Sequence, residues 1–427
     1  MRDIKSRSVR FSEMSDYLYE SYKILDSVFR DKAYGGETLY KALENAENAD
    51  VVYRIVMGVL ERNEELDYIV SALTEKRPKN AVSIILKQGI YCLKYMDSLP
   101  DYAVVNNSVQ LTKRIGKSSL AGFVNAVLKN ARDGKYELPS GDGEEALAIK
   151  YNKPAWIVRK VISDYGRETG GKILSEKPFD GVHLRTNSLI YNDQRFERDM
   201  NDNGERYEKT ATGYIAKISP LLKKLFIEGR ITYQSYTSTL AVKALDVSDG
   251  MKVLDVCSAP GGKAVLIAEK NPLAEVTACD IHAHRVGLIG AYARRMHVDN
   301  VKPTLADGTQ FNKQWESAFD RVLVDAPCSA SGIMRKHPDI LLNRKPEDVI
   351  SLKNLQKKIL HNAAKYVKNG GLLVYGTCSV FKEENEENVT DFLKNEDEFE
   401  LFPSNCDGQY IPDGYVDGFY IRRMRRK

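Results

Sequence analysis

The chain has 427 residues, of which 43% are hydrophobic and 29% charged, and its formal net charge is +4. This composition is typical of a soluble globular protein, and the length allows two or three domains. No apolar run approaches the roughly 20 residues that span a bilayer, and the charged N-terminus lacks the apolar segment of a secretory signal. We therefore expect a cytoplasmic protein that does not bind a membrane.

The six cysteines show neither a CxxC pair nor the paired spacing of a zinc site, so we expect free thiols and no metal. Cys92 lies on an apolar helix face and Cys279 inside a predicted strand, and both are expected in the core. A basic run near the C-terminus fits either a solvated tail or a nucleic-acid contact, and its charge alone does not decide between them. It consists of Arg422, Arg423, Arg425, Arg426 and Lys427.

The first part of the chain predicts a helical bundle. After a tail at 1–13, apolar residues recur at helical spacing throughout 14–135, which we expect to be one all-α domain. Its clearest helices lie within 49–73, 81–96, 102–116 and 118–134.

The middle of the chain has a mixed pattern. Residues 136–145 are polar and contain Pro, Gly and acidic residues, as expected of a linker. Residues 146–235 combine a helix near 154–166 with a strand near 181–190, and we expect a small α+β subdomain that binds RNA.

The last part, 236–427, alternates strands and helices regularly. This alternation predicts a mostly parallel, Rossmann-like sheet that helices cover on both faces. Two late runs, FELF and GFYIRRM, are expected to form its antiparallel edge. The parallel strands are expected at 253–257, 275–281, 301–306, 320–326 and 371–378, and the helices at 283–296 and 346–368.

The segment KVLDVCSAPGGKAVLIAEK at 252–270 reads as a strand, a glycine turn and a helix. This arrangement lets a ligand approach the backbone at a helix N-terminus, although a Gly-Gly turn alone is weak evidence. Asp280 ends the next strand roughly 20 residues after the turn, where a ribose-binding acid belongs. We therefore expect a nucleoside cofactor at this turn.

Two cysteines follow two later strands, at the edge of the sheet where ligands bind. Asp325 and Cys328 end the strand at 320–326, and Cys378 ends the strand at 371–378. If these strands lie successively beside the strand at 253–257, both thiols and the carboxylate converge next to the glycine turn. Methylation of carbon 5 of a pyrimidine needs such a set, because a thiolate added to carbon 6 makes carbon 5 nucleophilic. The residues alone do not decide which thiol attacks.

The motifs CSAPGGK, DAPCS and GTCS, followed by EENEEN and DGFYIRRM, resemble those of the Sun-type RNA (cytosine-5) methyltransferases. The N-terminal helices resemble the NusB-type RNA-binding domain in order and spacing. Together they resemble the bacterial members of the family that methylate 16S rRNA, and the resemblance covers nearly the whole chain.

The resemblance implies S-adenosylmethionine as the methyl donor and 16S rRNA as the partner, and we expect a monomer. It implies that Asp280 binds the ribose hydroxyls, that Asp307 lies by the adenine and that Asp325 lies between donor and base. It further implies that Cys378 is the nucleophile and that Cys328 assists product release. The residues that it places along the donor are Cys257, Ser258, Ala259, Pro260, Gly261, Gly262 and Lys263.

The target cytosine is expected to be unpaired or flipped out, because base stacking hides carbons 5 and 6 from a thiol. A tRNA cytosine-5 methyltransferase is an alternative, against which the NusB-like domain argues. A non-catalytic RNA-binding factor for ribosome assembly or antitermination is another, but it has no need of two thiols beside a donor site. The acidic EENEEN run is open to a plain interpretation as a solvated helix start.

Overall fold

The structure is a computed structural model that describes residues 11–31 and 49–427. It divides into two compact units, which are considered separately. The first contains residues up to Ser175 together with His337–Arg344, and the second contains Glu176–Lys336 and Lys345–Lys427. Most of the tail predicted at 1–13 lies outside the described residues. Among the residues described, none of the helices has the length and apolar character needed to cross a membrane.

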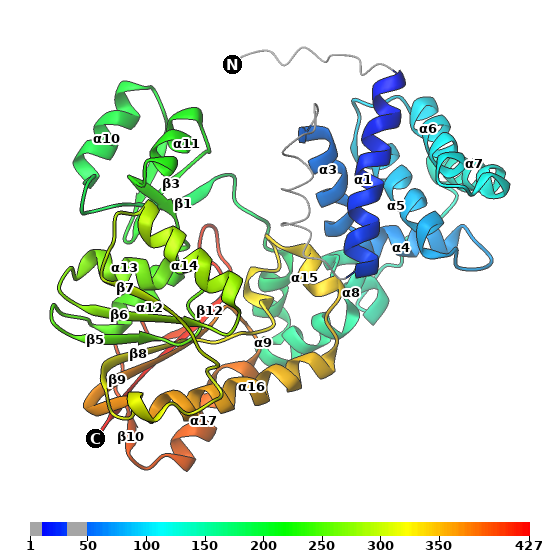
Figure 1. Cartoon of the computed structure of the whole chain (residues 1–427). Coiled ribbons are helices and arrows are strands. Elements are labelled where there is room, and N and C mark those ends of the chain that lie inside the picture. Colours follow the sequence, from blue (N-terminus) through cyan, green and yellow to red (C-terminus); the bar gives the residue numbers. More distant parts are fainter. Residues whose placement is uncertain (1–10, 32–48) are drawn as a thin grey trace. The chain divides into compact units, whose positions relative to one another are not determined.

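The first unit is all-helical, which confirms the predicted bundle (Figure 1). Helix α5 (Asn80–Tyr95) lies at its centre, with every residue from Val82 to Cys92 buried. Cys92 is therefore a core thiol, as predicted. The other helices are α1 (Phe11–Asp31), α3 (Ala49–Glu61), α4 (Asn63–Ala72), α6 (Asp101–Arg114), α7 (Ala121–Arg132), α8 (Glu144–Tyr151), α9 (Ala155–Ser175) and α15 (Pro338–Leu342), with a short 3-10 turn at Ser118–Leu120.

The helical segment expected at 49–73 consists of two helices. Arg62 has a non-helical backbone (φ −109°, ψ 22°) between α3 and α4, so the apolar pattern continues across a break that periodicity does not reveal. Helices α8 and α9, which we expected in the middle subdomain, belong to the helical unit.

The second unit begins with a small antiparallel sheet in the order β2-β3-β1-β4, which has two helices beside it. Tyr191, Phe196 and Tyr214 form its aromatic core together with aliphatic residues. The strands are β1 (Val182–Thr186), β2 (Tyr207–Thr210), β3 (Gly213–Ala216) and β4 (Ile231–Tyr233), and the helices are α10 (Asp193–Asp202) and α11 (Pro220–Ile227).

The rest of the second unit is built on a large mixed sheet in the order β10-β12-β9-β8-β5-β6-β7, with β11 paired to β12. The strands from β9 to β7 in this order are mutually parallel, and β12 is antiparallel to β9. The strands are β5 (Lys252–Asp255), β6 (Glu275–Asp280), β7 (Val301–Leu305), β8 (Phe319–Asp325), β9 (Val367–Thr377), β10 (Phe399–Leu401), β11 (Gly408–Tyr410) and β12 (Phe419–Arg426).

Helices cover both faces of this sheet, which confirms the predicted Rossmann-like architecture (Figure 1). One face packs on α12 (Tyr236–Leu245), α13 (Gly262–Lys270) and α14 (Ala283–Arg295). The other packs on α16 (Pro346–Ala364) and α17 (Glu386–Asn395). Cys279 is 1% exposed in this second core, as predicted.

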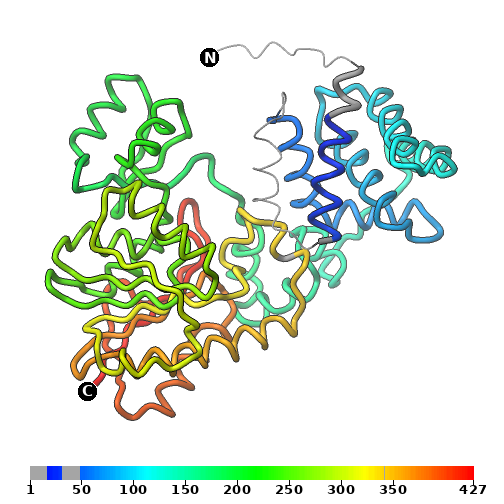
Figure 2. Tube along the Cα trace, in the orientation of Figure 1, coloured from blue at the N-terminus to red at the C-terminus, as the bar shows by residue number. Residues whose placement is uncertain are grey.

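The basic run at the C-terminus is not a solvated tail. Its arginines lie on β12, which pairs with β9 on one side and with β10 on the other. Figure 2 draws this last segment of the chain in red. Arg425 forms an ion pair with Glu400 and Arg426 with Glu398, both next to the sheet edge. Ile421, just before the run, and Met424, within it, are both buried, so the arginines belong to a strand inside the folded sheet.

Candidate functional site

The sheet order brings the three predicted segments together. Strand β8 lies between β5 and β9, and all three run parallel, so their carboxyl ends share one edge. We call 258–263, after β5, the donor turn. We call 326–331, after β8, and 378–381, after β9, the two cysteine turns. The convergence expected from the sequence therefore occurs in the fold.

The donor turn is shaped by its backbone. The amide of Ser258 donates to the carbonyl of Cys279 on the next strand at 2.7 Å, and the amide of Gly261 donates to the carbonyl of Ser258 at 2.7 Å. Gly261 has a φ of +108°, and a Cβ atom there would lie 3.2 Å from the Cα of Ile289. Glycine is required at this position because an L side chain would be both strained and crowded. The turn then leads directly into the N-terminus of α13.

Polar atoms at the base of the donor turn are suited to a charged ligand. Neither carboxylate oxygen of the buried Asp255, nor the Oγ of Ser258, makes a hydrogen bond of regular geometry within the described chain, although the Ser258 hydroxyl and the Cys257 amide are close enough to lower the pKa of Asp255. Burial and the neighbouring charge of Asp325 raise the pKa of Asp255 to about 7, although Lys263 acts to lower it. Buried polar groups nearly always find partners, so these atoms fit a site that a ligand completes. A bound ammonium group is the chemistry that they match.

Two of the three acids predicted to bind the cofactor lie at or after the ends of the next strands, β6 and β7. Asp280 is 5% exposed at the end of β6, where its Oδ1 accepts the amide of His282 at 2.9 Å and its Oδ2 lies 3.4 Å from Arg285. Asp307 follows β7, and its Oδ1 accepts both the amide and the hydroxyl of Thr309. Local hydrogen bonds therefore hold both carboxylates in place, at the ends of the two strands that follow β5 in the sheet.

A partly buried ion pair joins the donor turn to the end of β8, just before the first cysteine turn. The Nζ of Lys263 lies 2.5 Å from the Oδ2 of Asp325, and 5.5 Å from the centre of the Phe419 ring. Burial alone would lower the pKa of Lys263, but the charges of Asp325, Asp255 and Cys378 raise it. The ammonium is thus held charged beside the second cysteine turn.

The two thiols lie in contact. The Sγ of Cys328 is 3.2 Å from the Sγ of Cys378, and both side chains are partly buried. A hydrogen bond to Cys378, followed by burial, raises the pKa of Cys328 well above its usual range. Cys257, in the strand exit before the donor turn, also has a pKa well above its usual range because of burial and nearby carboxylates. It therefore stays a neutral thiol.

A residue that we did not expect at the site links the two cysteine turns. Glu384 is fully buried and accepts hydrogen bonds from Ser329 and Ser379, which directly follow the two cysteines. The plain interpretation of EENEEN as a solvated helix start is therefore wrong for this glutamate. The run begins in the turn before α17. Glu384 lies in that turn and is buried, whereas Glu387 lies on the helix and is exposed.

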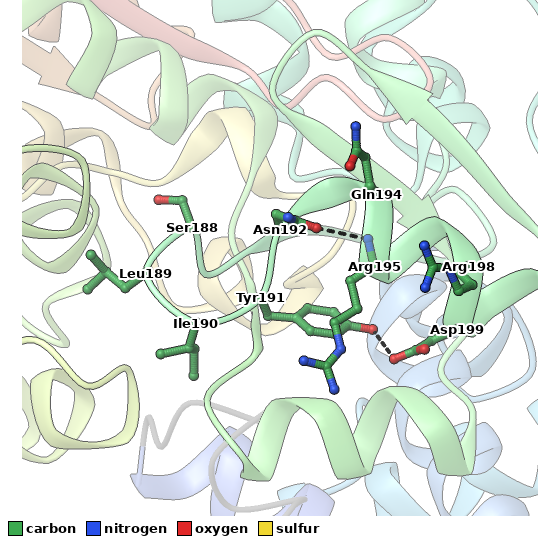
Figure 3. Close-up of a pocket in the computed structure, with 9 residues that line it drawn as sticks. All are labelled: Ser188, Leu189, Ile190, Tyr191, Asn192, Gln194, Arg195, Arg198 and Asp199. Carbon is green, nitrogen blue, oxygen red and sulfur yellow. Dashed lines mark hydrogen bonds between the residues drawn. The ribbon is translucent and has the colours of Figure 1, made fainter.

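One surface hollow lies away from these residues. It has a volume of about 670 Å³ and lies between the segment after β1 and helix α10 (Figure 3). Figure 3 shows Asn192 capping the helix and the hydroxyl of Tyr191 bound to Asp199. None of the predicted cofactor or catalytic residues lines it. The residues that line it are Ser188, Leu189, Ile190, Tyr191, Asn192, Gln194, Arg195, Arg198 and Asp199.

Known structures share this fold. PH0851 superposes with a TM-score of 0.81 over 99% of each chain, at 22% identity. NSun6 from Pyrococcus horikoshii with SFG superposes with a TM-score of 0.57 over 64% of this chain and 98% of that chain, at 18% identity.

Sequence comparisons extend across both units. A family model described as "16S rRNA methyltransferase RsmB/F" matches residues 242–423, and the NusB family model matches residues 17–133. The probable ribosomal RNA small subunit methyltransferase B of Bacillus subtilis is 32% identical over 93% of this chain and 96% of its own length. The ribosomal RNA small subunit methyltransferase B of Proteus mirabilis is 28% identical over 91% of this chain and 93% of its own. With its NusB-type helical unit and its Rossmann-like methyltransferase sheet, this chain belongs to the RsmB/F family of 16S rRNA methyltransferases.

Proposed function

We propose that the protein transfers a methyl group from S-adenosylmethionine to carbon 5 of a cytosine in 16S rRNA. The observation that carries this proposal is the pair of thiols, with Cys328 and Cys378 3.2 Å apart beside the Lys263–Asp325 pair. Methyl transfer to an exocyclic amine needs no thiolate, whereas activation of carbon 5 needs one that can add to carbon 6.

S-adenosylmethionine supplies a methyl group bonded to a positively charged sulfur. We assign residues 257–263 to the donor's amino-acid and ribose side, Asp280 to the ribose hydroxyls and Asp307 to the adenine. The unpartnered carboxylate of Asp255 supports this assignment, because it can accept hydrogen bonds from the donor's ammonium. No group of acidic, His or Cys residues in the described chain could hold a metal, and the proposed chemistry uses none.

Cys378 is the thiol that we assign as the nucleophile. The two sulfur atoms are 3.2 Å apart, and either thiol can donate the hydrogen bond to the other. The ammonium of Lys263 interacts with the charge of Cys378, and a neighbouring positive charge favours a thiolate nucleophile. The sequence left the choice open, and this neighbouring ammonium supports the assignment that the resemblance implied.

The Cys378 thiolate adds to carbon 6, and the resulting electron-rich carbon 5 attacks the methyl carbon while the methyl–sulfur bond breaks onto sulfur. We assign Asp325, which is paired with Lys263, to accept a hydrogen bond from the cytosine amino group. The Cys328 thiolate is the base that we assign to this step: it takes the carbon 5 proton, the electrons of that carbon–hydrogen bond re-form the double bond between carbons 5 and 6, and the bond from carbon 6 to sulfur breaks to release the Cys378 thiolate. Once Cys378 is bonded to carbon 6, the hydrogen bond that raises the pKa of Cys328 is lost. Cys328 can then ionise and serve in this release step.

We propose that the substrate cytosine is unpaired or flipped out and that the protein acts as a monomer. We also propose that 14–135 and 146–235 bind RNA, across a linker at 136–145, while 236–427 carries out the reaction. The NusB-type match over residues 17–133 supports a role of the first unit in RNA binding.

The test is a covalent RNA adduct. Cys328→Ala should leave the addition and methyl transfer intact but block release, so RNA and protein should migrate together on a denaturing gel after incubation with rRNA and S-adenosylmethionine. Cys328→Ala combined with Cys378→Ala is the control and should give no adduct. An adduct that persists in the double variant would contradict the role of Cys378, and its absence from the single variant would contradict the role of Cys328.

A further inference from the structure

We propose that Glu384 is a positioning residue, whose single buried carboxylate sets the relative position of the two cysteine turns and so controls the rate of thiol addition. This inference rests on the proposed roles of Cys328 and Cys378. Glu384 contacts neither cysteine through a hydrogen bond and acts through the residues that follow them.

The carboxylate binds both cysteine turns directly. Its Oε2 accepts hydrogen bonds from the hydroxyls of Ser329 and Ser379, each at 2.5 Å. Its Oε1 accepts the amide of Ser329 at 2.8 Å. Since Ser329 follows Cys328 and Ser379 follows Cys378, one side chain fixes the residues adjacent to both thiols.

A glutamine from the covering helix completes this arrangement. The Nε2 of Gln356, on α16, donates to the Oε1 of Glu384 at 2.9 Å and to the carbonyl of Pro327 at 2.9 Å. Asn388 donates to the Oε1 of Gln356 at 2.8 Å, which orients the amide. The first cysteine turn is thus held from both sides of Cys328.

A third serine, Ser331, connects the two cysteine turns by hydrogen bonds. The Oγ of Ser331 lies 2.9 Å from the Oγ of Ser379, and it accepts the amide of Val380 at 3.0 Å. The Oγ of Ser329 lies 3.1 Å from that of Ser331. These hydroxyls form a continuous buried network in which Glu384 is the only carboxylate, as far as the described residues show.

The energetics argue against a merely stabilising role. Glu384 is 0% exposed and has no ion pair with any described residue. Burying a carboxylate is costly unless hydrogen bonds satisfy it, and four donors here occupy its four acceptor sites. An apolar residue of similar size is often equally stable in such a place. A carboxylate retained beside two reactive thiols is better explained by the precise geometry that it imposes on them.

The charge of Glu384 also acts on the site. After the hydrogen bond to Cys378, burial and the charge of Cys378, the charge of Glu384 contributes to the raised pKa of Cys328. The carboxylate therefore supports the difference between the two thiols as well as their spacing. Removing its charge should move the ionisation of Cys328 to lower pH.

The experiment compares Glu384→Gln and Glu384→Asp with the surface variant Glu387→Gln. Glu387 lies on α17 in an exposed pair with Lys353, 2.7 Å away, and is the matched control. Each change is made in the Cys328→Ala protein, and the single-turnover rate of adduct formation is measured with rRNA and S-adenosylmethionine. We expect Glu384→Gln to slow addition by about 30-fold, with donor affinity and KM for rRNA within about twofold of the parent.

Glu384→Asp keeps the charge but is one carbon too short to reach both serines, so it should also slow addition. Glu387→Gln should behave as the parent. An unchanged addition rate in Glu384→Gln would overturn the proposal, and so would a slower rate accompanied by an equal loss of donor affinity. If Glu384→Gln does not fold, Ser379→Ala and Ser329→Ala provide the same measurement, since each removes one of its hydrogen bonds.

Failure of the proposed function gives a different result. If the parent Cys328→Ala protein forms no adduct, the covalent mechanism itself is contradicted. The Glu384 variants are then compared by methyl incorporation with Cys328 intact, where an unchanged kcat contradicts the positioning role and a lowered kcat at constant KM supports it.

Discussion

Two parts of the sheet edge differ in how their buried polar groups are hydrogen-bonded. We call Asp255 and the donor turn the donor side, and the two cysteine turns with Glu384 the thiol side. At and just before the donor turn, buried polar atoms of Ser258 and Asp255 make no hydrogen bond of regular geometry in the described chain. At the cysteine turns, the buried carboxylate of Glu384 has all its acceptor sites filled. The donor side therefore has polar atoms that a ligand could satisfy, whereas the thiol side is organised by hydrogen bonds within the chain.

This difference matches the proposed tasks of the two sides. A cofactor that is exchanged after every turnover benefits from a site whose interactions it completes itself. A nucleophile must instead be held within a few tenths of an ångström of its attack position, which a saturated network achieves. Lys263 and Asp325 lie where the two sides meet, 2.5 Å apart. The following changes test whether the two sides are separable.

The largest effect is expected from Cys378→Ala. Without the nucleophile, carbon 5 is not activated, and methyl incorporation into rRNA should fall on the order of 10⁴-fold or more. Donor affinity, measured by calorimetry, should remain within about twofold, because the donor turn contains no part of Cys378. A parallel loss of donor binding would show that the two sides are not separable.

Lys263→Met removes the charge that joins the two sides. It leaves Asp325 without its cation and Cys378 without a neighbouring positive charge, so kcat should fall about 100-fold or more. Donor affinity should also weaken, since Lys263 ends the donor turn. Lys270→Met is the control, because Lys270 is 55% exposed at the other end of α13. If kcat in Lys263→Met equals that of the control, the ion pair has no catalytic role.

The sequence predicted the parts of the fold that local patterns encode. Alternating strands and helices predicted the Rossmann-like sheet, and the order of the strands brought Cys328 and Cys378 to one edge. The break at Arg62 was not predicted, because the apolar spacing on either side of it continues in phase. The arginines of β12 were open to interpretation as a tail, because four charges in five residues leave only Met424 among them to indicate a buried strand face.

The site was predicted where it consists of residues at strand ends and missed where it depends on contacts between distant segments. Glu384 lies 55 residues from Ser329, to which it is hydrogen-bonded, and sits in a run of acids that are otherwise exposed or partly exposed. Only the packing of α16 and the turn after β9 buries it. The unpartnered atoms of Asp255 were equally invisible, since burial and the absence of a partner are properties of the fold.

A smaller effect is expected from pH at the donor side. Burial and the charge of Asp325 raise the pKa of Asp255 to about 7, so the folded protein holds this proton to higher pH than the unfolded chain does. The stability of the ligand-free protein should therefore fall as pH rises from about 4 to about 7. Because the donor's ammonium favours the ionised carboxylate, donor affinity should rise about eightfold from about pH 6 to about pH 7.5.

Asp255→Asn is the control for this dependence. The amide does not titrate, so calorimetric donor affinity should be weaker and nearly constant over the same pH interval. If Asp255→Asn keeps the full rise in affinity, another group titrates and Asp255 does not contact the ammonium. The thiol side should not respond in the same interval if the two sides are separable.

The smallest effect is expected from Thr377→Val, which probes the thiol side without touching Glu384. The hydroxyl of the fully buried Thr377 donates to the Oδ1 of Asn385 at 2.5 Å, and that asparagine also donates to the carbonyl of Ser379 at 2.9 Å. Valine fills the same volume but leaves the amide oxygen unpaired, which should cost about 1–2 kcal/mol of unfolding free energy in urea denaturation. Thr304→Val is the control. Among the described residues, the Thr304 hydroxyl binds the carbonyl of Lys302 near the surface, and its loss should change stability by less than about 0.5 kcal/mol.

If the hydrogen bonds of the thiol side are saturated, the loss of one bond in Thr377→Val should lower the addition rate only a few-fold, because Glu384 still holds both turns. A loss as large as that of Glu384→Gln would mean that the network is positioned by Asn385 instead.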